Sequence, residues 1–344
     1  MNAYDIIIIG SGPGGYVAAI RASQLGMNVG VVEKAEPGGI CLNWGCIPTK
    51  ALLKSAQVLE YCRHASDYGV NAGEAVADFS AVVTRSRGVA DAMSKGVQYL
   101  FKKYNIGIIK GFGRLAGENT VEVKAEDGTV TILTAPHIVL ATGARSKELP
   151  NLRQDGTRII GYREAMTMPS LPASMVVVGS GAIGSEFAYF YQTMGTEVTL
   201  VEFLPRVLPL EDEEVSRTVE RSFKKMKMKI LVNSSVDSVD TSGDKCRVTI
   251  KTPKGDVITE SDVVLSAVGV TPNLEGIGLE EAGVKTDRGK IVVDEYYRTS
   301  ARGVYAIGDI VPGPALAHVA SAEAIVCIEK IAGLNPEPVD YNVI

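Results

Sequence analysis

The stretch Ile6-Ile7-Ile8-Ile9-Gly10-Ser11-Gly12-Pro13-Gly14-Gly15 decides the fold of this chain. Four isoleucines favour a buried strand, and the glycines that follow, spaced as G-x-G-x-x-G, favour a tight turn into a helix over about 16–25. A second strand over 29–32 ends at Glu33, which is placed to accept ribose hydroxyls. This order of elements predicts a dinucleotide-binding unit, with the pyrophosphate at the N-terminus of the helix.

The same pattern occurs a second time. A strand over 175–178 leads into Gly179-Ser180-Gly181-Ala182-Ile183-Gly184, and a helix to about residue 194 precedes a strand over 197–201 that ends at Glu202. In both copies the acid lies 18 residues beyond the third glycine, from 15 to 33 and from 184 to 202. One such motif is weak evidence, but two with identical spacing predict two nucleotide sites. Glu202 would repel a 2′-phosphate, which favours NAD over NADP at the second site.

The rest of the chain fits an α/β fold built from two Rossmann-like dinucleotide-binding domains, the second inserted into the first. We expect helices between 51 and 104, short strands from 106 to 140, a hairpin over 247–259, a buried strand over 263–269 and a helix over about 316–332. A strand over 303–309 ends at Gly308-Asp309. Asp309 could bind cofactor hydroxyls or cap a turn, and His318 could serve a developing anion or be a surface residue in the first turn of its helix.

Composition limits the class of protein. The chain has 344 residues, 46% of them hydrophobic, and its net charge of −5 argues against a nucleic-acid partner. No apolar run reaches the roughly 18 residues of a membrane span, and the first strand begins too early to follow a signal peptide. We therefore expect a cytoplasmic protein in a reducing compartment, where a disulfide is more often catalytic than structural. No metal site is expected.

Cys41 and Cys46 are separated by Leu-Asn-Trp-Gly and followed by Ile47-Pro48-Thr49-Lys50. Two cysteines at this spacing can close a small disulfide ring or can both be small core residues, and the spacing leaves both readings open. Pro48 suits the first turn of a helix. Cys46 would then lie just before a helix N-terminus, whose partial positive charge favours a thiolate. We expect the other three cysteines to be ordinary buried or half-buried free thiols: Cys62, Cys246 and Cys327.

Taken together, these motifs resemble the flavoprotein disulfide reductases, and most closely the members of that family that oxidise dihydrolipoamide. The resemblance rests on five stretches: Gly10–Gly15 with Glu33, residues 38–50 with both cysteines, Ala141-Thr142-Gly143, Gly179–Gly184 with Glu202, and Gly308-Asp309 with Leu316-Ala317-His318. It implies an FAD domain over 1–147 and 271–344, and an NAD domain over 148–270.

The resemblance also implies roles for single residues. Cys46 would contact the flavin, and Cys41 would exchange with the substrate. Lys50, beside the reactive flavin nitrogen, would pair with Glu186. Asp309 would hold the flavin ribitol, and Ile183 would gate the nicotinamide pocket. The implied FAD site further contains Gly10, Gly12, Pro13, Gly14, Gly15, Glu33, Lys34, Gly39, Lys50, Thr142, Gly143, Gly308, Leu316, Ala317 and His318, and the implied NAD site contains Gly179, Gly181, Gly184, Glu202 and Gly269.

The implied activity is the oxidation of dihydrolipoamide through a Cys41–Cys46 disulfide and FAD, with reduction of NAD to NADH. The implied partners are lipoyl-carrying proteins of 2-oxo acid dehydrogenase or glycine cleavage complexes. The family continues into an interface domain that supplies a His–Glu acid/base pair across a homodimer, whereas this sequence stops at Ile344. We therefore expect a truncated form with impaired turnover and a weakened dimer. The alternatives are another NAD(P)H-dependent reductase, such as a glutathione or mercuric reductase, and a non-turning fragment that binds FAD and NAD.

Overall fold

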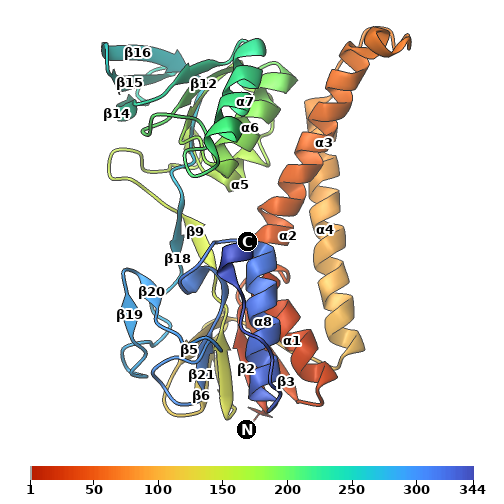
Figure 1. Cartoon of the computed structure of the whole chain (residues 1–344), viewed down its shortest axis with the longest axis vertical. Coiled ribbons are helices and arrows are strands. Elements are labelled where there is room, and N and C mark those ends of the chain that lie inside the picture. Colours follow the sequence, from red (N-terminus) through yellow and green to blue (C-terminus); the bar gives the residue numbers. More distant parts are fainter. Residues whose placement is uncertain (1) are drawn as a thin grey trace. The chain divides into compact units, whose positions relative to one another are not determined.

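The computed structural model describes residues 2–344, and these form two compact α/β units. Unit 1 comprises the chain up to Asn43, Ala90–Arg145 and Thr271–Ile344. Unit 2 comprises Trp44–Val89 and Ser146–Val270. Figure 1 shows the course of the chain through both units.

The centre of unit 1 is a five-stranded parallel sheet in the order β21-β8-β2-β3-β4. Its strands are β2 (Ile6–Ile9), β3 (Val29–Glu33), β4 (Gly107–Lys110), β8 (His137–Leu140) and β21 (Val304–Ala306). The isoleucines of β2 are buried on both faces, as expected for a central parallel strand. Helices α1 (Pro13–Gln24) and α8 (Ala317–Ile331) pack against each other beside this sheet (Figure 1).

A second, four-stranded sheet completes the core of unit 1 in the order β1-β7-β6-β5. Its strands are β1 (Asn2–Ala3), β5 (Phe112–Leu115), β6 (Thr120–Lys124) and β7 (Val130–Thr134). Ile7 and Ile9 of the parallel sheet share one apolar cluster with Leu115, Val121 and Leu133 of this second sheet. The short elements of the unit are α2 (Gly39–Asn43), β19 (Thr286–Asp287), β20 (Lys290–Ile291), η2 (Gly308–Ile310) and η3 (Tyr341–Val343).

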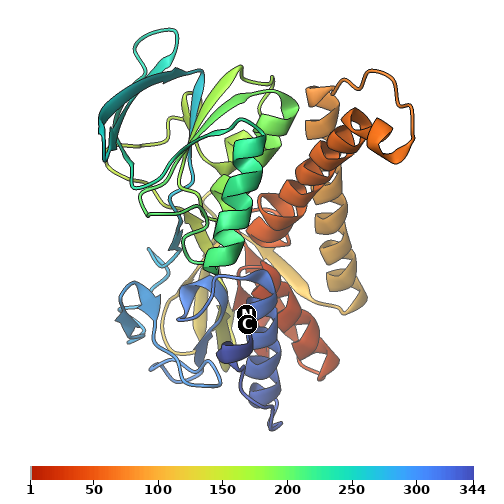
Figure 2. The same ribbon diagram turned by 45° about the horizontal axis from the view of Figure 1, so that its top comes forward.

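Unit 2 contains a second five-stranded parallel sheet, in the order β10-β17-β11-β12-β13. Its strands are β10 (Ile159–Ile160), β11 (Ser174–Val178), β12 (Glu197–Val201), β13 (Lys229–Leu231) and β17 (Val263–Ser266). Helices α6 (Ala182–Met194) and α7 (Glu213–Lys225) cover one face of the sheet. An antiparallel sheet of β14 (Ser235–Asp240), β15 (Cys246–Thr252) and β16 (Gly255–Ser261) lies on the other face (Figures 1 and 2).

The remaining elements are largely helical. Helix α3 (Cys46–Arg63) packs along α6 within unit 2. The others are α4 (Phe79–Lys103), which continues from unit 2 into unit 1, with α5 (Tyr162–Ala165) and η1 (Ala65–Tyr68). Strands β9 (Ala144–Ser146) and β18 (Val270–Pro272) pair where the chain passes between the units.

The predicted α/β fold with two Rossmann-like sheets is confirmed. The hairpin over 247–259 is β15–β16, and the helix over 316–332 is α8. Helix α1 begins at Pro13, earlier than the predicted residue 16, because proline suits the first helical positions. Cys46 is the first residue of α3, with Gly45 as its N-cap, rather than the residue before the helix.

The compact units differ from the sequence-based domains in one segment. The chain changes units at 145/146 and 270/271, close to the boundaries 147/148 and 270/271. Residues 44–89, which the domain boundaries placed with 1–147, group with unit 2, because helix α3 packs along α6. The assignment of FAD and NAD to the two domains stays a prediction.

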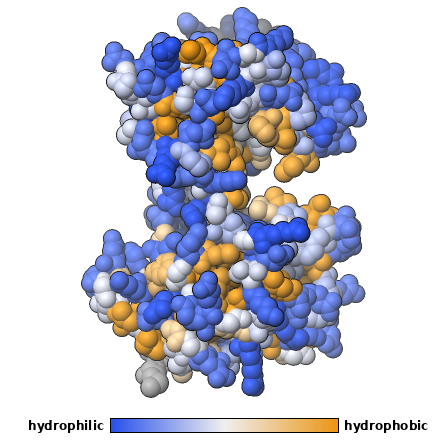
Figure 3. All heavy atoms as spheres, turned by 90° about the vertical axis from the view of Figure 1, so that its left-hand side faces the viewer, coloured by the Kyte–Doolittle hydropathy of each residue, from blue (hydrophilic) through white to orange (hydrophobic). Residues whose placement is uncertain are grey.

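The described residues contain no helix that is both long and apolar enough to cross a membrane. On the face drawn in Figure 3, hydrophilic side chains predominate and apolar patches lie between them.

Candidate functional site

The first glycine turn joins strand β2 to helix α1 and depends on the absence of side chains. Gly10 has a φ of 103°, and a Cβ on it would lie 2.2 Å from the carbonyl oxygen of Ala141. A Cβ on Gly15 would lie 1.9 Å from the carbonyl oxygen of Gly10. Gly12, the N-cap of α1, provides no side-chain hydrogen bond to the helix. The backbone N–H groups at this helix start therefore suit a bound pyrophosphate, as a dinucleotide requires.

The second glycine turn, between β11 and α6, has the same geometry. Gly179 has a φ of 96°, and a Cβ on it would lie 2.4 Å from the carbonyl oxygen of Ala267. A Cβ on Gly184 would lie 1.9 Å from the carbonyl oxygen of Gly179. Gly181 is again an N-cap without a side-chain hydrogen bond. Each unit thus contains one turn that fits a dinucleotide.

The acids at the ends of β3 and β12 are held in the same way. The Glu33 carboxylate accepts hydrogen bonds from the N–H and hydroxyl of Ser11 at 2.9 and 2.6 Å, and Glu202 accepts the same pair from Ser180 at 2.7 and 2.8 Å. Both carboxylates also accept the backbone N–H two residues later, at 2.8 Å. They are only 9% and 6% exposed. A carboxylate has about four acceptor positions, so one remains for a ribose hydroxyl.

The two serines were not singled out from the sequence. Their signal is the repeated Gly-Ser-Gly of the two turns, which places Ser11 and Ser180 at the same position in each motif. The serine side chain fixes the acid in each unit, so the acid faces the turn before any nucleotide binds.

Thr142 and Gly143 follow strand β8 and are held by Asn273. The Thr142 hydroxyl donates to the carbonyl oxygen of Asn273 at 2.7 Å, and the Asn273 amide donates back to the Thr142 carbonyl at 2.9 Å. The Asn273 N–H donates to the Gly143 carbonyl at 2.9 Å. Arg145 contacts the Asn273 amide oxygen at 3.1 Å and forms an ion pair with Glu275 at 2.7 Å. These contacts fix the Thr-Gly turn at the edge of the unit 1 sheet.

Asp309 lies in the short helix η2, directly after strand β21. Gly308 adopts a φ of 76°, and the Lys290 ammonium group donates a hydrogen bond to the Asp309 carbonyl oxygen. Burial raises the pKa of the Asp309 carboxyl, and the positive charge of Lys290 acts in the opposite direction. The Asp309 carboxyl is thus partly shielded from solvent and lies at the same sheet edge as Glu33 and Thr142, because all three follow parallel strands.

Cys41 is half-buried in helix α2, and Cys46 is exposed at the first position of α3. The dipole of α3 favours a thiolate at Cys46. The guanidinium groups of Arg87 and Arg163 lie 4.1 and 5.0 Å from the ring centroid of Trp44, which is between the cysteines in the sequence.

The other three cysteines match the prediction. Cys62 is half-buried, Cys246 and Cys327 are buried, and all three are free thiols. Burial raises the pKa of Cys246 and of Cys327. Their thiolates are disfavoured, so neither is suited to redox chemistry.

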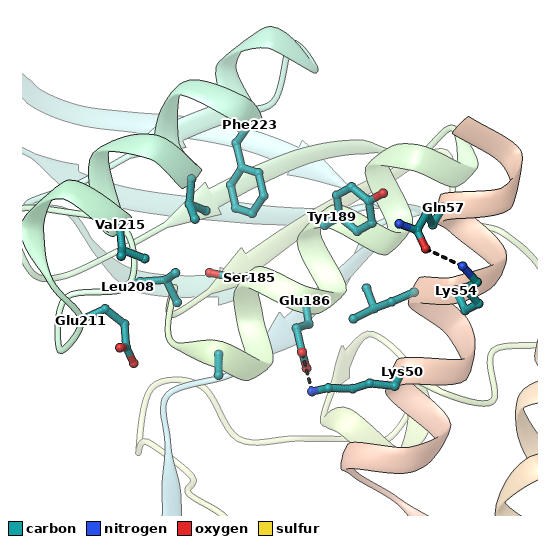
Figure 4. A pocket seen from close by; sticks show the side chains of 13 residues that line it. Lys50, Lys54, Gln57, Ser185, Glu186, Tyr189, Leu208, Glu211, Val215 and Phe223 are labelled. Atoms are coloured by element: carbon teal, nitrogen blue, oxygen red, sulfur yellow. Dashed lines mark hydrogen bonds and ion pairs between the residues drawn. The ribbon is translucent and has the colours of Figure 1, made fainter. Parts of the chain in front are cut away.

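The predicted contact between Lys50 and Glu186 is present. The Lys50 ammonium lies 2.6 Å from the Glu186 carboxylate, which joins α3 to α6 (Figure 4). Glu186 is shielded, at 28% side-chain exposure against 62% for Lys50. The pair lines a pocket of about 660 Å³ in unit 2, whose other lining residues are Leu53, Lys54, Gln57, Ala182, Ser185, Tyr189, Leu208, Glu211, Val215, Val219 and Phe223.

The other implied FAD residues lie in unit 1. Gly39 approaches Gly12 so closely that a Cβ on it would lie 2.5 Å from the Gly12 Cα. Leu316 is the N-cap of α8, and Ala317 and an exposed His318 form its first turn. Lys34 is exposed, with its ammonium 5.8 Å from the ring of Phe112.

Two further implied NAD residues lie beside the second turn. Ile183 is half-buried in the first turn of α6. Gly269 has a φ of 105° and accepts the Lys147 N–H through its carbonyl. Across residues 2–344, no three His, Cys, Asp or Glu side chains are grouped as ligands for a metal.

Comparisons with known proteins agree with this geometry. The family of pyridine nucleotide-disulphide oxidoreductases matches residues 4–324. A protein named dihydrolipoyl dehydrogenase from Rhizobium etli is 47% identical over 98% of this chain and 74% of its own length. One of the same name from Chlorobaculum parvum is 46% identical over 99% of this chain and 73% of its own length.

Among solved structures, LpdA from Mycobacterium tuberculosis superposes with a TM-score of 0.93 at 29% identity, over 100% of this chain and 75% of that chain. The family match covers both glycine turns and both cysteines. This chain belongs to the pyridine nucleotide-disulphide oxidoreductase family.

Proposed function

We propose that this chain is the cofactor-binding and redox part of a dihydrolipoyl dehydrogenase, an FAD-dependent oxidoreductase that oxidises a dihydrolipoyl group and reduces NAD. The observation that carries the proposal is the pair formed by Cys41 in α2 and Cys46 at the start of α3, in a chain with two dinucleotide turns of matching geometry. Relatives at 40–47% identity that bear this name support it.

The part of the proposed FAD site that binds the adenosine, the pyrophosphate and the ribitol lies in unit 1. It uses the first glycine turn for the pyrophosphate, Glu33 for the adenosine ribose, and Asp309 for the ribitol. The Thr142-Gly143 turn follows β8, which lies in the sheet between β21, before Asp309, and β2, before the glycine turn. Bound FAD would supply the two-electron link between a dithiol and a nicotinamide.

The NAD site that we propose lies in unit 2, at the carboxyl ends of β11, β12 and β17. The second glycine turn suits the pyrophosphate, and Glu202 suits the adenosine ribose. Glu202 also disfavours a 2′-phosphate through like charge. The guanidinium of Arg206, the first basic residue after Glu202, contacts the Pro209 carbonyl at 3.5 Å. We propose that Lys50 and Glu186 are catalytic residues and that Ile183 gates the nicotinamide pocket.

The two cysteines carry out the thiol chemistry in this proposal. A substrate thiolate attacks the Cys41 sulfur of a Cys41–Cys46 disulfide, which forms a mixed disulfide and releases Cys46 as a thiolate. The second substrate thiol then displaces Cys41, so the substrate leaves as a cyclic disulfide and both cysteines are reduced. Two electrons and two protons pass to the protein. The start of α3 stabilises the Cys46 thiolate.

The physiological donor that we propose is a lipoyl-carrying protein of a 2-oxo acid dehydrogenase or glycine cleavage complex, and the proposed assembly is a homodimer. We place the protein in the cytoplasm, since a reducing compartment suits a catalytic disulfide.

The test combines spectroscopy with substrate choice. Purified protein should be yellow from non-covalent FAD, and it should reduce NAD with dihydrolipoamide faster than it reduces oxidised glutathione or Hg(II) with NADPH. A preparation that stays colourless after FAD is added would refute the flavin site. Faster reduction of glutathione or mercury would move the assignment to another member of the family.

A further inference from the structure

Glu323 is a buried acid for which the proposed reaction has no use. It lies on α8 in unit 1 and is only 1% exposed. One carboxylate oxygen accepts the backbone N–H of Gly308 at 2.6 Å, and the other accepts the hydroxyl of Tyr341 at 2.8 Å. Burial raises the pKa of the Glu323 carboxyl, and these two hydrogen bonds act in the opposite direction. Burial of a carboxyl group costs free energy unless hydrogen bonds compensate, so the groups that bind Glu323 indicate what it does in the fold.

The hydrogen bonds continue to a strained residue. The Tyr341 hydroxyl lies 3.0 Å from the hydroxyl of Tyr297, which is 3% exposed and has a φ of 66°. A bulky aromatic residue in the left-handed region is a true outlier, and such strain persists only where the surroundings enforce it. The Tyr297 carbonyl also accepts the N–H of Ala306 in β21. The chain of contacts therefore begins at Gly308 and ends at Ala306, the last residue of β21, two positions earlier in the sequence.

Packing encloses the same turn. A Cβ on Gly308 would lie 3.4 Å from the Cβ of Ala320 on α8. A Cβ on Gly313, just beyond the turn, would lie 3.0 Å from the ring of Tyr341. Lys290 donates to the Asp309 carbonyl. Helix α8, the segment around Tyr341 and Lys290 thus fix the backbone on both sides of Asp309.

We propose that Glu323, with Tyr341, is a positioning residue for the flavin, because it holds the Gly308–Asp309 turn in the shape that presents the Asp309 carboxylate to the ribitol. This inference rests on the proposed FAD site. Without Glu323, the Gly308 N–H loses its acceptor and the turn gains freedom. FAD would then have to order the turn on binding, which weakens its affinity.

The test is a fluorescence titration of the flavin-free 344-residue protein with FAD. Glu323→Ala should raise the Kd for FAD by about tenfold or more. Glu323→Gln should raise it by less than about threefold, since its amide oxygen can accept the Gly308 N–H and its amide group can donate to Tyr341. Tyr341→Phe keeps the ring against Gly313 but removes the hydroxyl, and should fall between these values.

Tyr191→Phe is the matched control. The Tyr191 hydroxyl is also buried and donates to the Ala165 carbonyl at 2.5 Å, but it lies in unit 2. Its loss should lower the melting temperature and leave the Kd for FAD unchanged. If Glu323→Ala lowers the melting temperature of the flavin-free protein but keeps the Kd for FAD within twofold, the inference is wrong and Glu323 is only structural.

Two outcomes separate this inference from the proposed function. If Glu323→Ala does not fold, Tyr341→Phe decides, and an unchanged Kd for that variant overturns the inference. If the unaltered protein binds no FAD, the proposed function is wrong and the inference falls with it. If the unaltered protein binds FAD and both variants match it, only the inference falls.

Discussion

At the scale of single residues, the acids of the two glycine motifs are the basis of the cofactor preferences that we propose. Glu33 and Glu202 occupy the same position in the two motifs, and each accepts hydrogen bonds from the serine of its own turn, so the different cofactors that we propose for them follow from the unit in which each lies. The hydrogen bonds from Ser11 and Ser180 fix the position of the carboxyl group of each acid. In the NAD site that we propose, Glu202 at the end of β12 would disfavour the 2′-phosphate of NADP.

We predict that NADH binds better than NADPH and that Glu202→Ala narrows this preference by about tenfold or more, because the like charge facing the 2′-phosphate is removed. Kd values for both nucleotides measure the effect. Glu33→Ala is the matched control in unit 1 and should weaken FAD binding without altering the ratio. Equal binding of NADH and NADPH by the unaltered protein would contradict the prediction.

Replacement of Cys41 and replacement of Cys46 should affect the absorption spectrum of the bound flavin differently. Partial reduction should give a long-wavelength absorbance from a Cys46 thiolate against oxidised flavin, since Cys46 starts helix α3. Cys46→Ser should abolish this band, and Cys41→Ser should keep it. Cys62→Ser is the control and should leave unchanged both the long-wavelength band and the reduction of the Cys41–Cys46 pair. A band lost with Cys41→Ser but kept with Cys46→Ser would reverse the roles.

At the scale of elements, hydrogen bonds between side chains and backbone N–H groups fix the loops that precede strands. Asp155, in the loop before β10, accepts the backbone N–H groups of Thr157, Arg158 and Ile159 at 2.7, 2.7 and 3.1 Å. Burial alone would raise the pKa of the Asp155 carboxyl, but these hydrogen bonds lower it below its ordinary value of 3.8. The folded state therefore binds the proton of Asp155 more weakly than the unfolded state does.

Asp155→Asn should lower the free energy of unfolding by about 1 kcal/mol at pH 7. Because the folded-state pKa is depressed, the stabilisation by Asp155 is complete above about pH 5 and is lost as the pH falls below 3.8 through the folded-state pKa. Urea unfolding of both proteins from pH 7 to 3 should show a difference that shrinks with acid. A difference that stays constant to pH 3 would be inconsistent with this role.

At the scale of the whole molecule, electron transfer between the two cofactors and oxidation of the dithiol substrate need different groups. Residues 1–344 contain both glycine turns, both acids, the Lys50–Glu186 pair and both cysteines. Oxidation of a dithiol also needs a group that removes the thiol proton. General acid–base groups contribute about 10²–10⁴-fold to such steps.

We predict that residues 1–344, assayed by themselves, pass electrons from NADH to an artificial acceptor, and that they oxidise dihydrolipoamide at least about a hundredfold more slowly than a full-length relative. Steady-state turnover with both substrates measures the two rates on one preparation. Near-normal dihydrolipoamide turnover would identify a base within these residues. His318→Ala would then be the first variant to test, since His318 is exposed in the first turn of α8.

The sequence by itself determined the elements whose signals are local. Ile6–Ile9, the two glycine motifs and the acids at 33 and 202 predict strand, turn and helix from neighbours within a few residues. The positions of the nucleotide turns follow, because G-x-G-x-x-G requires close backbone contact wherever it occurs. The resemblance to known reductases added the pairing of Lys50 with Glu186, which residue spacing alone does not contain.

Tertiary structure alone decided which distant residues support these motifs. Asn273 holds Thr142 across 131 positions, and Glu323 reaches back to Gly308 from another element. Residues 44–89 join unit 2 because α3 packs along α6. Such contacts depend on which helix and sheet faces meet in the folded chain. Local propensity therefore places the chemistry along the sequence, while packing determines how firmly each group is held.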